Sequence, residues 1–162
     1  EGRTAVMAYG TSGVPLAEFE PLFGLDDEAL KARNAVRVTA DSKPGFPCRV
    51  TLEDAEPGET LILLNYEHQP AATPYRSGHA IFVREAARAE AVFDNEVPPL
   101  LGTRLLSVRA FDTAGMMVDA DCVEGAELEP LIERLFGNPD ATYLHVHNAR
   151  RGCFAARVDR RS

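Results

Sequence analysis

The chain has 162 residues and a formal net charge of −8, which argues against a surface that neutralises many phosphates, so we expect no nucleic-acid partner. Hydrophobic residues make up 45% of the chain and charged residues 26%, values typical of a soluble globular protein with a core of its own. The longest apolar run, residues 61–64, is too short to cross a bilayer, and no signal-like segment opens the chain. We therefore expect no membrane partner and a cytoplasmic location.

The first third of the chain predicts short helices. We expect a single domain over residues 1–162, with residues 1–11 as a flexible or appended segment. Helices are predicted over residues 16–23 and 26–33, with Gly24 separating them. Asp26 is suited to cap the second helix, because its side-chain oxygen can accept a free amide of the first turn.

Strands are predicted in the middle of the chain. Short strands at residues 35–39 and 48–52 flank a loop rich in proline and glycine. The run over residues 60–68 is the strongest strand prediction, because it is apolar and is followed by Pro70, where a helix could not continue. We place this strand at the centre of a sheet and expect another strand over residues 79–84.

The C-terminal half predicts two hairpins around a helix. Residues 104–111 and 117–123 form the first hairpin, joined through an Asp-Thr-Ala-Gly turn. Residues 127–136 carry apolar side chains at helical spacing and stop at a glycine. Residues 142–147 and 153–159 form the second hairpin.

Strands outnumber helices and most connections are short, a pattern that favours antiparallel pairing. We therefore predict an α+β fold with one mainly antiparallel, mixed sheet. The C-terminal helix and the short N-terminal helices are expected to pack on one face of this sheet. The other face is expected to form a polar concavity.

The densest cluster of reactive side chains lies in the last hairpin. Strand alternation puts Tyr143, His145 and His147 on one face, and Asn148 and Cys153 follow closely. One interpretation is a metal-dependent enzyme using His145 and His147, since two imidazoles at this spacing can bind one ion, with His68, Cys48 or Cys153 as further ligands. The other is a pair of hydrogen-bonded polar residues. Because no second compact ligand pair is present, we assign no metal ligand from the sequence.

The three cysteines have no spacing typical of a zinc ribbon or a thioredoxin motif, so we expect free thiols. Cys122 is interpreted as a small packed residue. Cys48 and Cys153 each enter a predicted strand, and either could be a reactive thiol or a buried hydrophobic one. A disulfide between them remains open at this stage.

A third motif lies in residues 75–79, which include Tyr75, Arg76, a serine, a glycine and a histidine. A guanidinium beside hydroxyl groups can hold a carboxylate or a phosphate. The alternative is that Arg76 pairs with one of the chain's 25 acidic side chains, an interaction of little energetic value at a surface.

The same segments carry a family resemblance. They are KPGFPCRVTLEDA at residues 43–55, NYEHQ at 65–69, YRSGHAIFVR at 75–84, HVHN at 145–148 and the Gly-Cys pair at 152–153, with PLFGL at 21–25 also fitting. The chain resembles the bacterial family known as domain of unknown function 1203, over nearly its whole length after the first dozen residues. The resemblance implies a single soluble bacterial domain. It implies no particular substrate, cofactor or catalytic residue.

We therefore predict a pocket that binds a small polar or anionic molecule, with the protein acting as an enzyme or as a binding module only. The ligand-binding residues are predicted to be Tyr75, Arg76, His68, His145 and Cys153.

In the enzyme version, Cys48 is the nucleophile or redox thiol, His147 the general base, and Asn148 orients the base or stabilises an oxyanion. In the alternative, these residues satisfy one another in a buried polar network and the module is not catalytic. The sequence specifies no cofactor and no oligomeric state.

Overall fold

The structure of the protein is a computed structural model that describes residues 8–161. Its strands form two antiparallel sheets, a six-stranded sheet in the order β5-β1-β9-β8-β6-β7 and a three-stranded sheet in the order β2-β3-β4. The strands are β1 (Tyr9–Ser12), β2 (Val36–Thr39), β3 (Thr60–Gln69), β4 (Ser77–Arg84), β5 (Val92–Asp94), β6 (Leu105–Phe111), β7 (Met117–Glu124), β8 (Tyr143–Asn148) and β9 (Phe154–Arg160). The helices are α1 (Asp27–Lys31), α2 (Pro99–Gly102) and α3 (Leu128–Phe136), with single 3₁₀ turns at Leu16–Glu18, Glu20–Leu22 and Gly125–Glu127. The predicted α+β class is confirmed.

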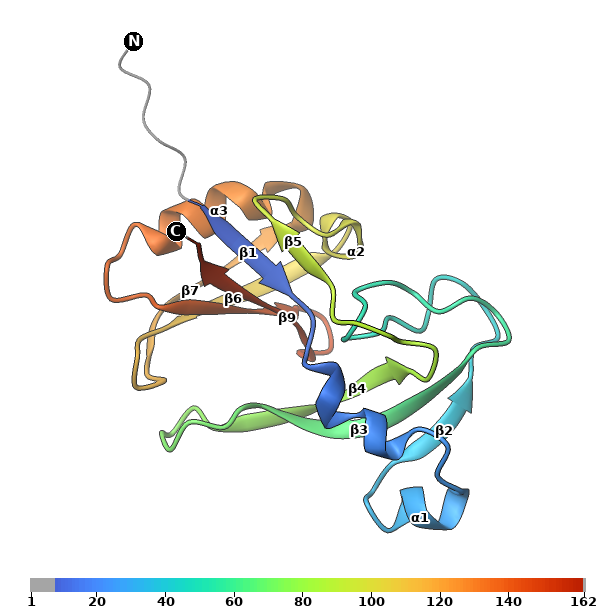
Figure 1. Cartoon of the computed structure of the whole chain (residues 1–162). Coiled ribbons are helices and arrows are strands. Elements are labelled where there is room, and N and C mark those ends of the chain that lie inside the picture. The colour runs from blue at the N-terminus through green and yellow to red at the C-terminus, as the bar shows by residue number, and fades with distance from the viewer. Residues whose placement is uncertain (1–7, 162) are drawn as a thin grey trace.

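Helix α3 covers the outer face of the six-stranded sheet (Figure 1). Its apolar residues repeat at helical spacing, and five of them are buried: Leu128, Leu131, Ile132, Leu135 and Phe136. They pack against the buried side chains of β6, β8 and β9, including Val108 and Leu144. Burial of a side chain of this size stabilises the fold by about 1.5–3 kcal/mol. The packing of α3 therefore stabilises the six-stranded sheet.

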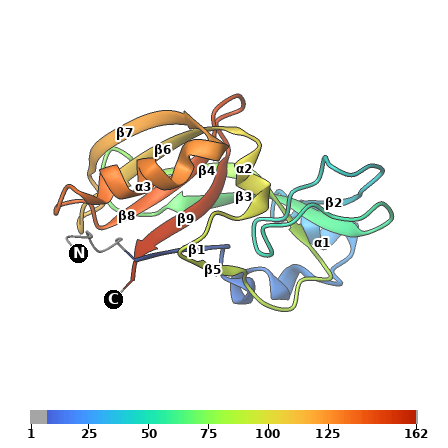
Figure 2. The same ribbon diagram turned by 90° about the horizontal axis from the view of Figure 1, so that it is seen from above.

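The three-stranded sheet lies against the other face of the six-stranded sheet (Figure 1). The core between them includes Ile62 of β3, Ile81 and Val83 of β4, and Phe154 of β9. Seen from above, α1 and β2 extend to one side of the larger sheet (Figure 2). Because the two sheets pack face to face, every second residue of each facing strand points into the space between them.

Both predicted hairpins are present, since β6 pairs with β7 and β8 pairs with β9. The strand predicted at residues 60–68 is the central strand of the smaller sheet. Asp26 caps α1 as expected, because its Oδ1 accepts the amide of Ala29 at 2.8 Å. The helix predicted at residues 16–23 is instead two single 3₁₀ turns, interrupted at Phe19.

Three predictions about the sheet need correction. The chain forms two sheets that face one another, where one sheet with a free polar face was expected. Residues 48–52 form no strand, because after an isolated bridge at Cys48 the backbone turns, with Leu52 at a φ of 55°. Strands β1 and β5 were not predicted, although β1 lies between β5 and β9. The segment predicted as flexible falls partly on residues 1–7, which lie outside the described residues.

Among residues 8–161, no helix combines the length and the apolar character needed to cross a membrane.

Candidate functional site

All four histidines of the chain meet between the two sheets. His68 comes from β3, His79 from β4, and His145 and His147 from β8. The ring centroids of His68 and His79 are 4.9 Å apart, those of His68 and His147 are 4.9 Å apart, and those of His79 and His147 are 5.3 Å apart. The ring of His145 lies 5.4 Å from that of His68. We call this group the histidine cluster.

Strand geometry explains the convergence. His145 and His147 share a face of β8 because they are two residues apart, and Leu144 and Val146 on the other face belong to the core beneath α3. His68 lies on β3 within an irregularity that shifts the β3–β4 register between Tyr66 and Gln69, and its ring points into the core. Because the two sheets pack face to face, residues about 70 positions apart in the chain become neighbours.

The rings are held by specific hydrogen bonds. His147 Nδ1 lies 2.8 Å from the carbonyl oxygen of Gly152, which can only accept, so Nδ1 carries the proton and donates. His147 Nε2 is then the ring nitrogen with the lone pair, and Nη1 of Arg109 lies 3.4 Å from it. His68 Nε2 and His79 Nδ1 lie 2.8 Å apart and share one hydrogen bond. Ser77 Oγ lies 3.5 Å from the same nitrogen of His68.

Burial keeps these imidazoles neutral. His145 and His147 have exposed fractions of 1% and 0%, and His68 of 7%. Burial, with smaller effects from neighbouring histidines and arginines, lowers the pKa of His145 to about 2. The same cause lowers the pKa of His147 to about 3 and that of His68 to about 4. Burial and Arg109 also lower the pKa of the half-buried His79. All four rings are therefore lone-pair donors at neutral pH.

Several buried polar atoms beside the cluster have no hydrogen-bond partner among the described residues. They are His68 Nδ1, His145 Nδ1 and Asn148 Oδ1. A buried polar atom without a partner is costly, about 1–3 kcal/mol, and native proteins have few of them. Among the described residues one other such atom is found, Thr11 Oγ1 of β1.

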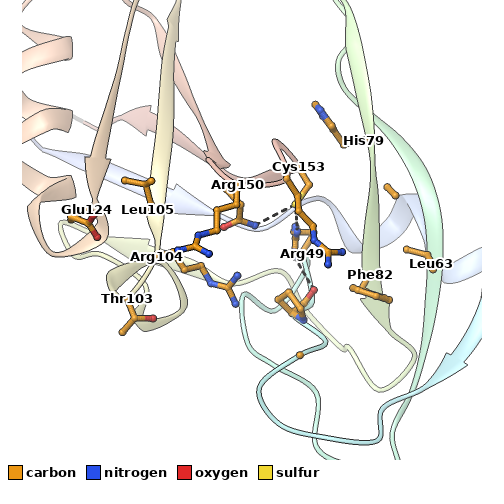
Figure 3. Close-up of a pocket in the computed structure, with 15 residues that line it drawn as sticks. Arg49, Leu63, His79, Phe82, Thr103, Arg104, Leu105, Glu124, Arg150 and Cys153 are labelled. Carbon is orange, nitrogen blue, oxygen red and sulfur yellow. Dashed lines mark hydrogen bonds between the residues drawn. The ribbon is translucent and has the colours of Figure 1, made fainter.

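A pocket with a cavity volume of about 940 Å³ opens beside His79 of the histidine cluster. Figure 3 shows the residues that line it. Its wall includes His79 and Phe82 from β4 and Leu105 from β6, so it lies between the two sheets. Its polar lining is dominated by arginine, with Arg49, Arg104, Arg150 and Arg151, and also includes Asn148 and Cys153. Glu124 supplies the one carboxylate of the lining, although the whole chain has eight more acidic than basic residues.

Arg49 is the buried arginine of this pocket, with an exposed fraction of 4%. Its Nε donates to the carbonyl oxygen of Phe154 at 2.5 Å, its Nη1 to that of Pro47 at 2.9 Å, and its Nη2 to the sulfur of Cys153 at 3.4 Å. Burial lowers the pKa of Arg49, and the neighbouring Cys153 opposes this effect. No carboxylate accepts from its guanidinium within residues 8–161.

The predicted thiols have different surroundings. Cys153 is half buried, lines the pocket, and accepts hydrogen bonds from Arg49 and from Asn148 Nδ2, the latter at 3.4 Å. Cys48 is fully buried in the core between the sheets, and its sulfur accepts the amides of Thr51 and Arg84. Its role as a nucleophile stays a prediction, which this burial does not favour. Cys48, Cys122 and Cys153 are all free thiols, so the disulfide left open by the sequence is not formed.

Of the other predicted site residues, His68, His145 and His147 lie in the cluster, and Asn148 lines the pocket. Arg76 and Tyr75 are exposed at the start of β4 and line neither feature. Arg76 forms a surface ion pair with Glu67, with distances of 2.6 and 3.3 Å. The predicted role of Arg76 in binding an anion stays a prediction, and the arginines that line the pocket are other residues.

The predicted site residues do not include His79, Arg49 or Arg104. His79 belongs to the segment noted for Arg76, and strand alternation from Ile81 could have placed it on the buried face. Nothing in the local sequence marks Arg49, because its position depends on a turn that replaces the predicted strand.

A family model described as "Protein of unknown function (DUF1203)" matches residues 45–160, which span every residue of the histidine cluster. The chain therefore belongs to this family. No curated protein and no solved structure matches the chain.

Proposed function

We propose that the protein binds a small anionic molecule in the arginine-lined pocket between its two sheets. Four arginines and one glutamate line this pocket, which makes it a positive site in a protein of net charge −8. Such a contrast draws a negatively charged ligand to one place on an otherwise acidic molecule. A carboxylate or a phosphate group is the chemistry that guanidinium groups recognise best, because its oxygens match their paired N–H donors.

The environment of Arg49 is the observation on which the proposal depends. A buried cation is costly unless it is paired with a negative group. Its guanidinium has five N–H groups, and three of them donate to Phe154, Pro47 and Cys153. The two remaining N–H groups have no partner among the described residues. An anion entering the pocket would supply both the missing hydrogen bonds and the missing charge.

Asn148 and Cys153 complete the proposed binding wall. The side-chain amide of Asn148 donates to the sulfur of Cys153 and leaves its own oxygen unpaired. Two donors on one sulfur hold the thiol in a fixed position at the pocket surface. The catalytic roles predicted for His147 and Asn148 would need a ligand in this pocket, so ligand binding is the first property to test.

The test is a calorimetric titration with inorganic phosphate and with citrate. The variant Arg104→Gln/Arg150→Gln removes two pocket charges that are less buried than Arg49. A charge-assisted hydrogen bond is worth about 1.5–3 kcal/mol, so even partial loss should weaken binding at least about tenfold. Arg33→Gln is the matched control, since Arg33 is exposed and does not line the pocket. Binding of neither probe, or equal affinity in the double variant and the wild type, would contradict the proposal.

We further propose a reducing compartment, in keeping with a cytoplasmic location. The support is that Cys48, Cys122 and Cys153 are unpaired, since secreted proteins commonly pair their cysteines. The excess of negative charge supports the absence of a nucleic-acid partner. Fractionation of the producing cell, followed by detection of the protein, tests the location.

A further inference from the structure

We infer that His68, His79 and His147 bind a divalent transition-metal ion of the zinc type. One ring nitrogen from each of the three residues lies within 4.8 Å of the other two. Imidazole nitrogens are typical ligands of zinc, iron, copper and nickel, whereas magnesium and calcium prefer oxygen. This inference does not depend on the proposed anion binding, because the three ligands are histidines and none of them is one of the pocket arginines to which that proposal assigns the anion.

The distances fit such an ion after small side-chain rotations. A zinc ion with Zn–N distances of about 2.0–2.1 Å in tetrahedral geometry separates its ligand atoms by about 3.3 Å. His68 Nε2 and His79 Nδ1 are 2.8 Å apart and would separate slightly. The nitrogen of His147 lies within 4.8 Å of both and would move closer. The ion would replace two contacts: the hydrogen bond between His68 and His79, and the one between Arg109 Nη1 and His147 Nε2.

The protons of the three rings are compatible with this arrangement. Each neutral imidazole has one proton and can keep it on the nitrogen that faces away from the ion. His147 already does so, because its Nδ1 donates to the carbonyl oxygen of Gly152. A ligating histidine commonly donates its other N–H to a carbonyl group, which fixes its orientation. His68 Nδ1 has no partner, so a proton can reside there without breaking another hydrogen bond.

The charges near the cluster influence which group can occupy the fourth ligand position of the ion. Three neutral imidazoles leave the full charge of the ion uncompensated, and no carboxylate belongs to the group. Arg109 adds a positive charge, with its Nη1 3.4 Å from His147 Nε2. The fourth position is open to water, hydroxide or an anion, and a negative group there would offset the positive charge. Because His79 also lines the pocket, this position lies beside a route for such a group.

His145 is the natural control. It is buried beside the cluster and its ring contacts that of His68, but it lies outside the group of three. The ligands inferred here therefore differ from the pair that the sequence suggested, His145 and His147. His147 is kept together with His68, which was expected as a further ligand, His145 is left out, and His79 is added from the smaller sheet.

The experiment measures metal binding directly, on protein without an affinity tag that has been stripped with a chelator. Calorimetric titration with Zn²⁺ should give one ion per chain, and Co²⁺ should give the visible absorption of a nitrogen-ligated tetrahedral site. His79→Gln is the main variant, because His79 is only half buried and the fold should survive its replacement. Its Zn²⁺ affinity should fall at least about 100-fold. His145→Gln should keep the one-to-one stoichiometry.

Three outcomes would overturn the inference. The first is less than one Zn²⁺ per wild-type chain at saturation. The second is equal affinity in His79→Gln and the wild type, with circular dichroism confirming that both are folded. The third is an absorption band of cobalt bound to thiolate that disappears in Cys153→Ser, since this would place the ion on the pocket thiol. His68→Gln, tested in the same way, should reproduce the loss seen in His79→Gln.

Discussion

The ion pair between Arg37 and Glu85 should make the stability of the protein depend on pH in a calculable way. Arg37 of β2 donates from Nε to Glu85 Oε1 at 2.8 Å and from Nη2 to Oε2 at 2.9 Å, and both residues are half buried. Glu85 also accepts the amide of Gly24 at 3.1 Å. Hydrogen bonding from Arg37, which outweighs the opposing effect of burial, lowers the pKa of Glu85 to about 2 from a usual value of 4.5.

The sign follows from proton binding. Because the pKa of Glu85 is lower in the folded state, the unfolded chain binds the proton more tightly, so stability decreases with falling pH. The contribution is fully present above about pH 4.5 and is lost progressively as the pH falls towards 2. One pKa unit corresponds to about 1.4 kcal/mol, which sets an upper limit of about 3.4 kcal/mol. Partial solvent screening reduces this to about 2 kcal/mol.

Urea denaturation of four proteins measures the effect: the wild type, Arg37→Met, Glu85→Gln and the double variant. The double-mutant cycle isolates the coupling between the two side chains from all other titrating groups. We expect a coupling free energy of about 1–2 kcal/mol at pH 7, of which more than half is lost by pH 3. A coupling energy near zero at pH 7, or one that does not change between pH 7 and pH 3, would refute this reasoning.

Three further predictions concern the thiols and the packing. Cys153 should react with a thiol reagent in the native protein, while the buried Cys48 should react only after unfolding. The measurement is the number of thiols labelled rapidly in a Cys122→Ser variant, where we expect one. Rapid labelling of Cys48 would contradict the prediction. Gly13→Ala should lower the free energy of unfolding by about 1–3 kcal/mol, because the added Cβ would lie 2.0 Å from the carbonyl oxygen of Val50. Gly102→Ala is its control, since nothing lies within 4 Å of the added atom, and an equal loss in both variants would count against the steric explanation. Ile132→Ala should cost about 2–5 kcal/mol, because Ile132 lies on the buried face of α3 and is 1% exposed. Chemical denaturation measures the cost, and a value below about 1 kcal/mol would show that α3 is not held by this core.

Local patterns in the sequence predicted the parts of the fold that local physics decides. Alternation placed His145 and His147 on one face of β8, because successive side chains of a strand point to opposite sides. Helical spacing of apolar residues predicted α3, and turn residues predicted both hairpins. Asp26 was recognised as a cap because its side chain meets an amide three residues away.

The arrangement of the two sheets could not be predicted in the same way. The convergence of His68 and His79 with β8 depends on packing between strands that are distant in sequence, which no local pattern specifies. Strand β1 is short and gains its partners only when β5 and β9 lie on either side. Arg49 was assigned to a strand, and its burial beside Phe154 follows from tertiary contacts alone. The predicted site residues therefore include three of the four clustered histidines, His68, His145 and His147, and omit His79 and the pocket arginines.

The most direct test of anion binding is a crystal structure of the protein grown with selenate, a tetrahedral oxyanion whose selenium atom is located by anomalous scattering. We predict a selenium peak in the pocket, with selenate oxygens accepting hydrogen bonds from the two free N–H groups of Arg49 and from Arg104. A pocket without selenium, in a crystal where selenate is bound elsewhere on the molecule, would contradict the proposal that this cavity is the anion-binding site.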